Sequence, residues 1–215
     1  IIQKATELGV SIIVPLLSER TIVQLDGEDL GKKQQKWQRI AIEACKQCGQ
    51  NWVPEVTNPM KVEAFARQSR DPLKLIAAIS PEAQNLKTIL ATRGQDGAPL
   101  AAAASLMIGP EGDFTPAELS QAFSHGFAPL SLGPIILRSE TAAIYALSIT
   151  GHELRLVKTS GLGVVFAIGV GSGKLIEPHR LAPEPKQLHI VPAGYHYNIL
   201  AEGGDDLYQE MIKFC

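Results

Sequence analysis

Short apolar runs alternate along the chain with segments whose apolar residues recur at helical spacing. The apolar runs predict buried strands at Val10–Leu17, Leu73–Ala78, Ala101–Ile108 and Phe127–Leu132. The helical spacing predicts helices over residues 1–9, 33–48, 60–69, 81–92 and 139–148. Strands that alternate with helices predict an α/β fold, in which helices cover both faces of a parallel sheet.

Local signals mark where several of these elements begin and end. Gly9 predicts the end of the first helix. Thr115, Pro116 and Glu118 predict a helix start, because threonine caps the first turn, proline suits the first helical position and Glu118 completes a capping box. Short extended pieces are predicted at Thr21–Val23 and Val53–Val56.

Size and charge narrow the classes of protein. The 215 residues fit one sizeable domain, or one domain with an appendage, and the net charge is −2. No run of 18 apolar residues occurs, so we expect no membrane span, and the first residues do not resemble a signal peptide. Any RNA binding would therefore depend on a local basic patch, a partner subunit or a further domain.

Three cysteines indicate a reducing compartment. Cys45 and Cys48 form a C-x-x-C motif near the end of a helical pattern. A zinc site needs two more ligands, and the sequence has no second cysteine pair. We interpret both cysteines as helix residues rather than a metal or redox site, and we expect no bound metal.

Two glycine-proline loops follow predicted strands. Gly109 to Phe114 joins a buried strand to the capped helix, and Leu132 to Ala142 leads into the helix at 139–148. Ligands of open parallel sheets bind at the carboxyl ends of strands, where glycines let the backbone come close. Neither loop has phosphate-loop or dinucleotide-binding spacing. The first loop alone is equally well explained as a turn, and the second loop alone is better explained by helix capping with a surface ion pair.

Taken together with upstream motifs, the two loops make residues 1 to about 150 resemble the RsmE family of 16S ribosomal RNA uridine-N3 methyltransferases, of the SPOUT class. The motifs occur in the same order: Lys4-Ala5-Thr6-Glu7-Leu8-Gly9, Ser18-Glu19-Arg20, Lys36-Trp37 with Arg39, Glu43-Ala44, Gln47-Cys48-Gly49, Gly109-Pro110-Glu111-Gly112, Gly126-Phe127 and Leu137-Arg138-Ser139-Glu140-Thr141-Ala142.

The resemblance implies a cytoplasmic homodimer whose parallel sheet ends in a C-terminal trefoil knot. It also implies S-adenosylmethionine as cofactor and small-subunit ribosomal RNA as substrate. The cofactor would be held mainly by backbone groups of the two loops, at Ile108, Gly109, Pro110, Glu111, Gly112, Leu132, Gly133, Ile136 and Leu137.

The reaction suggests which side chains would act. Uracil N3 becomes nucleophilic only as its proton leaves, which builds negative charge on the flanking oxygens. An arginine would stabilise that charge and a carboxylate would take the proton. Arg138 and Glu140 are the first candidates, followed by Arg20 and Glu7. An equally good explanation for Glu7 and Arg20 is that they pair with each other or with the backbone.

One row of basic residues lies on the predicted helix at 33–48 and just before it. Lys32, Lys36 and Arg39 are spaced i, i+4 and i+7, opposite the apolar row formed by Trp37, Ile40, Ala41 and Ala44. Such a row contacts phosphates in RNA-binding proteins, although a solvated helix face explains it equally well.

Three departures separate the chain from the family pattern: a missing domain, two positions that usually hold arginine, and a C-terminal extension beyond the point where the family normally ends. The N-terminal RNA-binding domain of the family is absent from this chain, which also lacks an initiator methionine and so looks like the inside of a longer protein. Gln50 and Ile135 stand where arginine is common, and Asp113 stands where a third glycine is frequent. Ile135 and Gln50 favour an alternative function, a non-catalytic knotted module that binds cofactor or RNA.

The composition changes after Thr150, so we predict a methyltransferase domain at 1–150 and an appendage at 151–215. Pro185 to His196 resembles the end of an α/β-hydrolase, where a last strand leads to a catalytic histidine. No Gly-x-Ser-x-Gly motif supplies a nucleophile, so His196 is interpreted as structural or left over. An inactive fusion with a hydrolase fragment is a further alternative.

Overall fold

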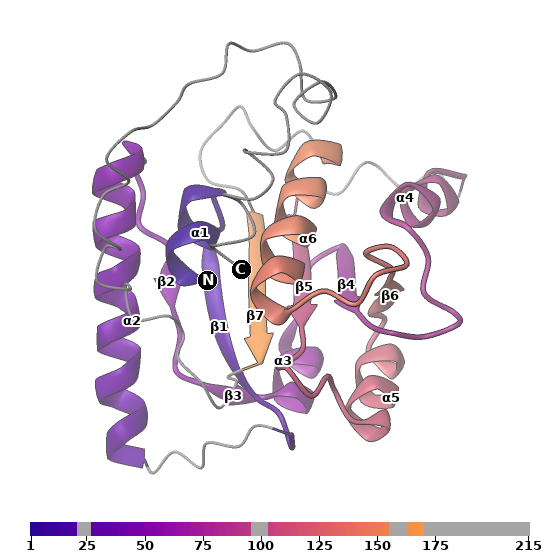
Figure 1. Cartoon of the computed structure of the whole chain (residues 1–215), viewed down its shortest axis with the longest axis horizontal. Coiled ribbons are helices and arrows are strands. Elements are labelled where there is room, and N and C mark those ends of the chain that lie inside the picture. Colours follow the sequence, from indigo (N-terminus) through magenta and orange to yellow (C-terminus); the bar gives the residue numbers. More distant parts are fainter. Residues whose placement is uncertain (21–26, 96–102, 155–162, 170–215) are drawn as a thin grey trace, which may run out of the picture. The chain divides into compact units, whose positions relative to one another are not determined.

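The computed structural model describes residues 1–20, 27–95, 103–154 and 163–169 (Figure 1). The chain divides into two units, Ile1–Glu177, which is compact and contains every described residue, and Pro178–Cys215. The extended piece predicted at Thr21–Val23 lies outside the described residues, as do all of the second unit and His196. None of the described helices combines the length and the apolar character that a membrane span requires.

One sheet of parallel strand pairs organises the described part of the first unit. Its order is β2-β1-β7-β5-β4-β6, and β3 also pairs with β1. The strands are β1 (Ile12–Leu17), β2 (Glu55–Val56), β3 (Met60–Lys61), β4 (Leu73–Ala77), β5 (Ala103–Ile108), β6 (Ala128–Leu130) and β7 (Gly163–Gly169). The predicted parallel sheet is therefore confirmed.

Helices cover both faces, as predicted. They are α1 (Ile2–Glu7), α2 (Gly27–Cys48), α3 (Val62–Gln68), α4 (Leu86–Gln95), α5 (Pro116–Ser124) and α6 (Ser139–Glu153). Buried residues of α1, α2, α4 and α6 pack on one face, and those of α3 and α5 pack on the other. Successive strand residues alternate between these two layers, so Leu106 lies in the first core and Met107 in the second.

The helix-start signals are also confirmed. Thr115 Oγ1 accepts from the Glu118 amide at 3.3 Å, and Glu118 Oε2 accepts from the Thr115 amide at 2.8 Å, with Pro116 in the first turn. Gly9 has φ +83°, which suits its place just after α1. The helix predicted at 33–48 is longer in the structure, because α2 begins at Gly27.

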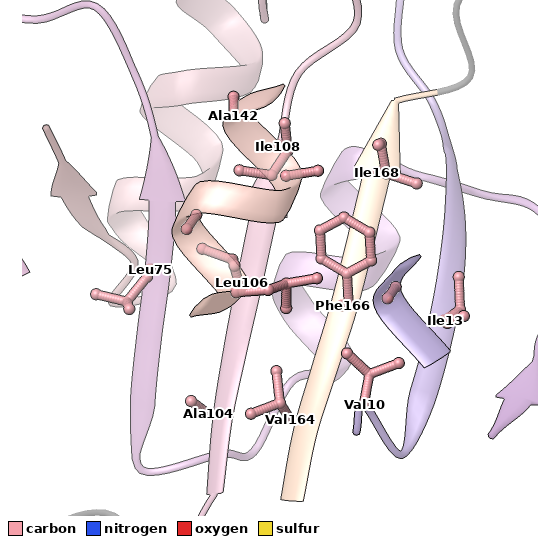
Figure 2. Packing of buried hydrophobic residues seen from close by; sticks show 14 of the residues in the cluster. Val10, Ile13, Leu75, Ala104, Leu106, Ile108, Ala142, Val164, Phe166 and Ile168 are labelled. Carbon is pink, nitrogen blue, oxygen red and sulfur yellow. The ribbon is translucent and has the colours of Figure 1, made fainter. Parts of the chain in front are cut away.

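The strand β7 was not anticipated from the sequence. Its apolar run stands among glycines in the part expected to be an appendage. In the structure β7 pairs with β1 from Ile12↔Val165 onward and with β5 along six residue pairs, and it belongs to the Ile1–Glu177 unit. Phe166 is fully buried and lies between Leu106 and Ile13 (Figure 2). The sheet core thus extends beyond the boundary at about 150.

Candidate functional site

The first loop joins β5 to α5 through a tight turn. The Asp113 amide donates to the Pro110 carbonyl oxygen at 2.9 Å, which closes the turn. Asp113 has φ +59°, a left-handed conformation that glycine adopts freely and aspartate tolerates better than most residues. Its Oδ1 accepts from the Phe114 amide at 2.8 Å. This conformation explains why an aspartate suits a position where glycine is frequent.

Gly109 is enclosed by the same turn. A Cβ atom on Gly109 would lie 2.9 Å from Asp113 Oδ1 and 3.2 Å from Asp113 Cα. Both distances are shorter than ordinary van der Waals contact, so any side chain at 109 would displace the turn. Gly109 and Pro110 are buried, whereas Glu111 and Gly112 are exposed.

The second loop connects β6 to α6. Gly133 takes the left-handed φ of +113°, and its amide donates to Ser131 Oγ at 3.3 Å. Ile135 and Ile136 follow and are 75% and 78% exposed. Adjacent exposed isoleucines give this loop an apolar edge, a feature of surfaces that a ligand or a partner covers.

A third segment, which follows β4, completes the site and was missed in the sequence. β4 and β6 pair in parallel up to Ala77↔Leu130, and the Ala78 amide then donates to the Leu130 carbonyl oxygen at 3.4 Å. The segment from Ala78 to Ala83 therefore lies beside the second loop. No local pattern could reveal this wall, because it depends on which strands are neighbours in the sheet.

The three segments line a cavity of about 400 Å³ at the carboxyl ends of β4, β5 and β6. This is the edge where open parallel sheets bind ligands, and the volume is within the range of small-molecule sites. Eight of the nine residues predicted to hold the cofactor line the cavity, and Gly112 is the exception. The structure thus gathers the predicted residues, and their role in binding stays a prediction.

The four candidate catalytic residues are not all gathered at the cavity. Arg138 lines it, and Arg20 lies beside the first loop, where its Nη1 donates to the Gly112 carbonyl oxygen at 2.6 Å. Glu7 instead pairs with Lys4, whose Nζ is 2.6 Å from Glu7 Oε2. Glu140 is in the first turn of α6, and neither glutamate is among the lining residues. Arg20 thus pairs with the backbone and not with Glu7.

A buried carboxylate, not singled out in the sequence beyond its capping role, connects the segment after β1 to α5. Glu118 is 5% exposed. Its Oε1 accepts from the Glu19 amide at 2.9 Å, and its Oε2 accepts from Ser18 Oγ at 3.2 Å as well as from the Thr115 amide. Because Arg20 is the next residue along, Glu118 holds the turn from which Arg20 reaches the first loop.

We expect Glu118→Ala to lower the free energy of unfolding by about 2–3 kcal/mol, since two part-buried backbone amides and the buried Ser18 hydroxyl lose a charged acceptor. Urea unfolding followed by circular dichroism measures the change. The matched variant Glu43→Ala removes an exposed pair with Lys46 and should cost less than about 0.5 kcal/mol. Equal losses in the two variants would contradict the anchoring role of Glu118.

The predicted RNA-contacting row is exposed on α2. Lys32, Lys36 and Arg39 all face solvent, whereas Trp37 and Ala41 of the same helix are buried. The amphipathic helix is therefore confirmed. Contact between this row and RNA stays a prediction.

The C-x-x-C cysteines lie at the end of α2, as predicted for helix residues. Cys45 is buried and its Sγ donates to the Trp52 carbonyl oxygen at 3.2 Å, while Cys48 is exposed. Burial raises the pKa of the Cys45 thiol, and Cys48 adds to the rise, which disfavours the thiolate that binds metals. Among the described residues, no three His, Cys, Asp or Glu side chains are grouped to hold a metal.

Gln50, where arginine is common in the family, has a structural role away from the cavity. With its amide oxygen turned toward the Trp52 indole, it accepts from Trp52 Nε1 at 2.7 Å and donates to the Thr6 carbonyl oxygen at 2.8 Å. Gln50 thus ties the end of α2 to α1.

The fold and the site together define an α/β domain of the open parallel-sheet class, with a cavity whose volume is typical of small-molecule sites. A family model described as an RNA methyltransferase domain matches residues 1–151. The chain belongs to this family. That result confirms the resemblance seen in the sequence.

Two relatives of the chain share one name. The chain is 32% identical over 158 residues to Ribosomal RNA small subunit methyltransferase E of Bacillus subtilis, covering 74% of this chain and 62% of that protein. It is 36% identical over 148 residues to the protein of that name from Synechocystis, covering 69% and 46% respectively. The chain therefore spans about half to three fifths of the length of these relatives.

A solved structure gives the same match. The ribosomal RNA small subunit methyltransferase E from Neisseria gonorrhoeae, bound to S-adenosyl methionine, is 38% identical and superposes with a TM-score of 0.63. The match covers 71% of this chain and 60% of that one. A putative methyltransferase from Legionella pneumophila, in complex with the cofactor SAM, is 40% identical with a TM-score of 0.62, covering 71% and 59%.

Proposed function

We propose that this chain is the catalytic domain of an S-adenosylmethionine-dependent enzyme that methylates a uridine at N3 in small-subunit ribosomal RNA. The observation that carries the proposal is the cavity at the carboxyl ends of β4, β5 and β6, which both glycine loops line. The Neisseria gonorrhoeae relative bound to S-adenosyl methionine supports the choice of cofactor.

The residues present fit such a cofactor. Gly109 leaves a cradle that even one Cβ atom would disturb, and mainly apolar residues line the cavity around it. The amides and carbonyls of the two loops are suited to hold an adenosine and an amino acid through the backbone. When bound, S-adenosylmethionine supplies an electrophilic methyl group.

The chain's own side chains then act on the base. Arg138, on the cavity wall, stabilises the negative charge that builds on the uracil oxygens as N3 loses its proton. Arg20 keeps the first loop in place through the Gly112 carbonyl oxygen. Glu140 stays our candidate for the proton acceptor, and Glu7, already held by Lys4, is the least suited. The base must leave its stack to reach this site.

Two measurements test this function. Calorimetry should show one S-adenosylmethionine bound per chain. Incubation with small ribosomal subunits and a labelled cofactor should transfer the label to 16S RNA, where mass spectrometry of the digested RNA should find 3-methyluridine. A chain that binds no cofactor would overturn the proposal.

The row of Lys32, Lys36 and Arg39 is the proposed RNA contact. Charge reversal at these three positions should lower the rate of methyl transfer to ribosomal RNA and make that rate less dependent on salt concentration.

We expect Arg138→Ala to lower the rate of methyl transfer about 100-fold to 1,000-fold, the effect of losing a group that stabilises developing charge. Cofactor affinity should change less than about threefold, since the loops bind mainly through the backbone. Arg67→Ala, at an exposed position of α3, is the control and should retain the full rate. A loss of affinity equal to the loss of rate would place Arg138 in cofactor binding instead.

The second candidate function is a module that binds cofactor or RNA without turnover. The exposed Ile135, standing where arginine is common in the family, favours it. Cofactor binding without methyl transfer to ribosomal subunits would decide for this module.

A third hypothesis is that residues 151–215 are a fragment of a hydrolase. Esterase activity that is lost in His196→Ala would support it.

The assembly that we propose is the one that the family resemblance implies. We infer a trefoil knot and a cytoplasmic homodimer for the methyltransferase domain. Ile144 and Tyr145 of α6, together with Ile135 and Ile136, are exposed apolar residues that support a dimer contact near the cavity. Light scattering of the purified chain should give twice the monomer mass of 23.1 kDa.

A further inference from the structure

The end of β7 lies against the first loop of the site. β5 and β7 pair in register up to Ile108↔Ile168. The next residue on β5 is Gly109, which begins the loop, and the next on β7 is Gly169. The two central strands, β5 and β7, therefore end side by side at the proposed cofactor site.

Gly169 lies so close to this loop that no room is left for a side chain. A Cβ atom on Gly169 would lie 2.5 Å from Pro110 Cδ, 2.6 Å from Pro110 N and 3.1 Å from the Gly109 carbonyl carbon. Two of these are backbone atoms, which cannot turn aside as the end of a long side chain can. Any residue with a side chain at 169 must displace the loop or the strand end.

The strand that makes this contact is well anchored. Val164, Phe166, Ala167 and Ile168 are each no more than 2% exposed, and β1 and β5 flank the strand on its two sides. Anchored in this way, β7 resists displacement, and the loop is the part expected to yield. The family match ends at residue 151, so this support comes from chain beyond the family domain.

We propose that β7 is a buttress for the cofactor loop and that Gly169 is a positioning residue for S-adenosylmethionine binding. The inference rests on the proposed function for the ligand, and the contact itself rests on the geometry of Gly169 and Pro110. Gly169 is not among the residues that line the cavity. It acts through the turn that Pro110 and Asp113 close.

Gly169→Ala tests the proposal through two readouts. The cofactor Kd should rise about tenfold by calorimetry. Hydrogen exchange of a peptide covering 109–114 should also speed up without cofactor, because the Asp113 amide bonds to Pro110 within the displaced turn. Gly31→Ala is the matched control, since a Cβ there meets nothing within 4 Å, and both readouts should stay unchanged.

The two readouts separate the possible outcomes. If the unaltered chain binds no cofactor but Gly169→Ala still speeds exchange at 109–114, the proposed function fails and the buttress stands. If neither readout moves, the buttress is wrong. A double-mutant cycle with Pro110→Ala adds a direct check, because effects on the Kd that simply multiply would deny contact between the two residues.

If Gly169→Ala fails to fold, a second substitution on β7 tests the same proposal. Ile168→Val removes one methyl group beside Ile108 and should keep the fold. It should also speed exchange at 109–114, whereas Ile89→Val, at a buried position of α4 outside the cavity lining, should not. Equal exchange in these two variants would overturn the proposal.

Discussion

Gly109→Val is expected to weaken S-adenosylmethionine binding at least about 100-fold, equivalent to roughly 2.7 kcal/mol. A single Cβ atom at 109 would lie 2.9 Å from Asp113 Oδ1 and 3.3 Å from the Phe114 amide nitrogen. Valine adds two methyl groups to that conflict. The turn must open, and with it the wall of the cavity that β5 supports. Calorimetry on the purified variant measures the loss.

A loss of affinity reports on the cofactor site only if the Gly109→Val variant remains folded. Circular dichroism should show a helix content equal to that of the unaltered chain, because the turn lies after β5 and outside the two cores. Gly31→Val, at an open position of α2, is the control and should bind cofactor normally. Undiminished binding by Gly109→Val would mean that the first loop is not part of the cofactor site.

Phe166→Ala is expected to lower the free energy of unfolding by about 3–5 kcal/mol. Phe166 is 0% exposed and belongs to the core under α1 and α6. Figure 2 shows Phe166 between Leu106 of β5 and Ile13 of β1, so its loss would leave a cavity between these strands. Urea unfolding, with the slope of the transition compared between variants, gives the value.

Val165→Ala on the same strand is the matched comparison. Val165 is only partly buried and faces the opposite layer, so we expect a loss of about 1 kcal/mol. A loss below about 1 kcal/mol for Phe166→Ala would show that β7 does not lie in the core in solution. That result would also remove the buttress proposed for the cofactor loop.

The features predicted correctly from the sequence depend on residues close together along the chain. Thr115 and Glu118 are three positions apart and bond to each other, so their identities suffice to predict the start of α5. The apolar face of α2 follows from helical spacing alone. The first loop was found for the same reason, because its glycines and its strand are contiguous.

The features that were missed join segments far apart in the chain. β7 lies in a glycine-rich stretch that the sequence assigns to an appendage, and only its partners β1 and β5 make it a central strand. Glu118 had a local reason to exist as a cap, and its bonds to Ser18 and Glu19 reach across 100 and 99 residues. Glu7 and Glu140 resembled family positions, but the structure does not place them on the cavity.

By itself the sequence determined the alternation of strands and helices, the capped helix, the two glycine loops and membership of the RNA methyltransferase domain family. Only the tertiary structure decided the strand order, the third wall after β4, and the place of Gly169 against Pro110. The reason is physical. Spacing and caps act over one or two helical turns, whereas strand neighbours are chosen by the burial and hydrogen bonding of the whole sheet.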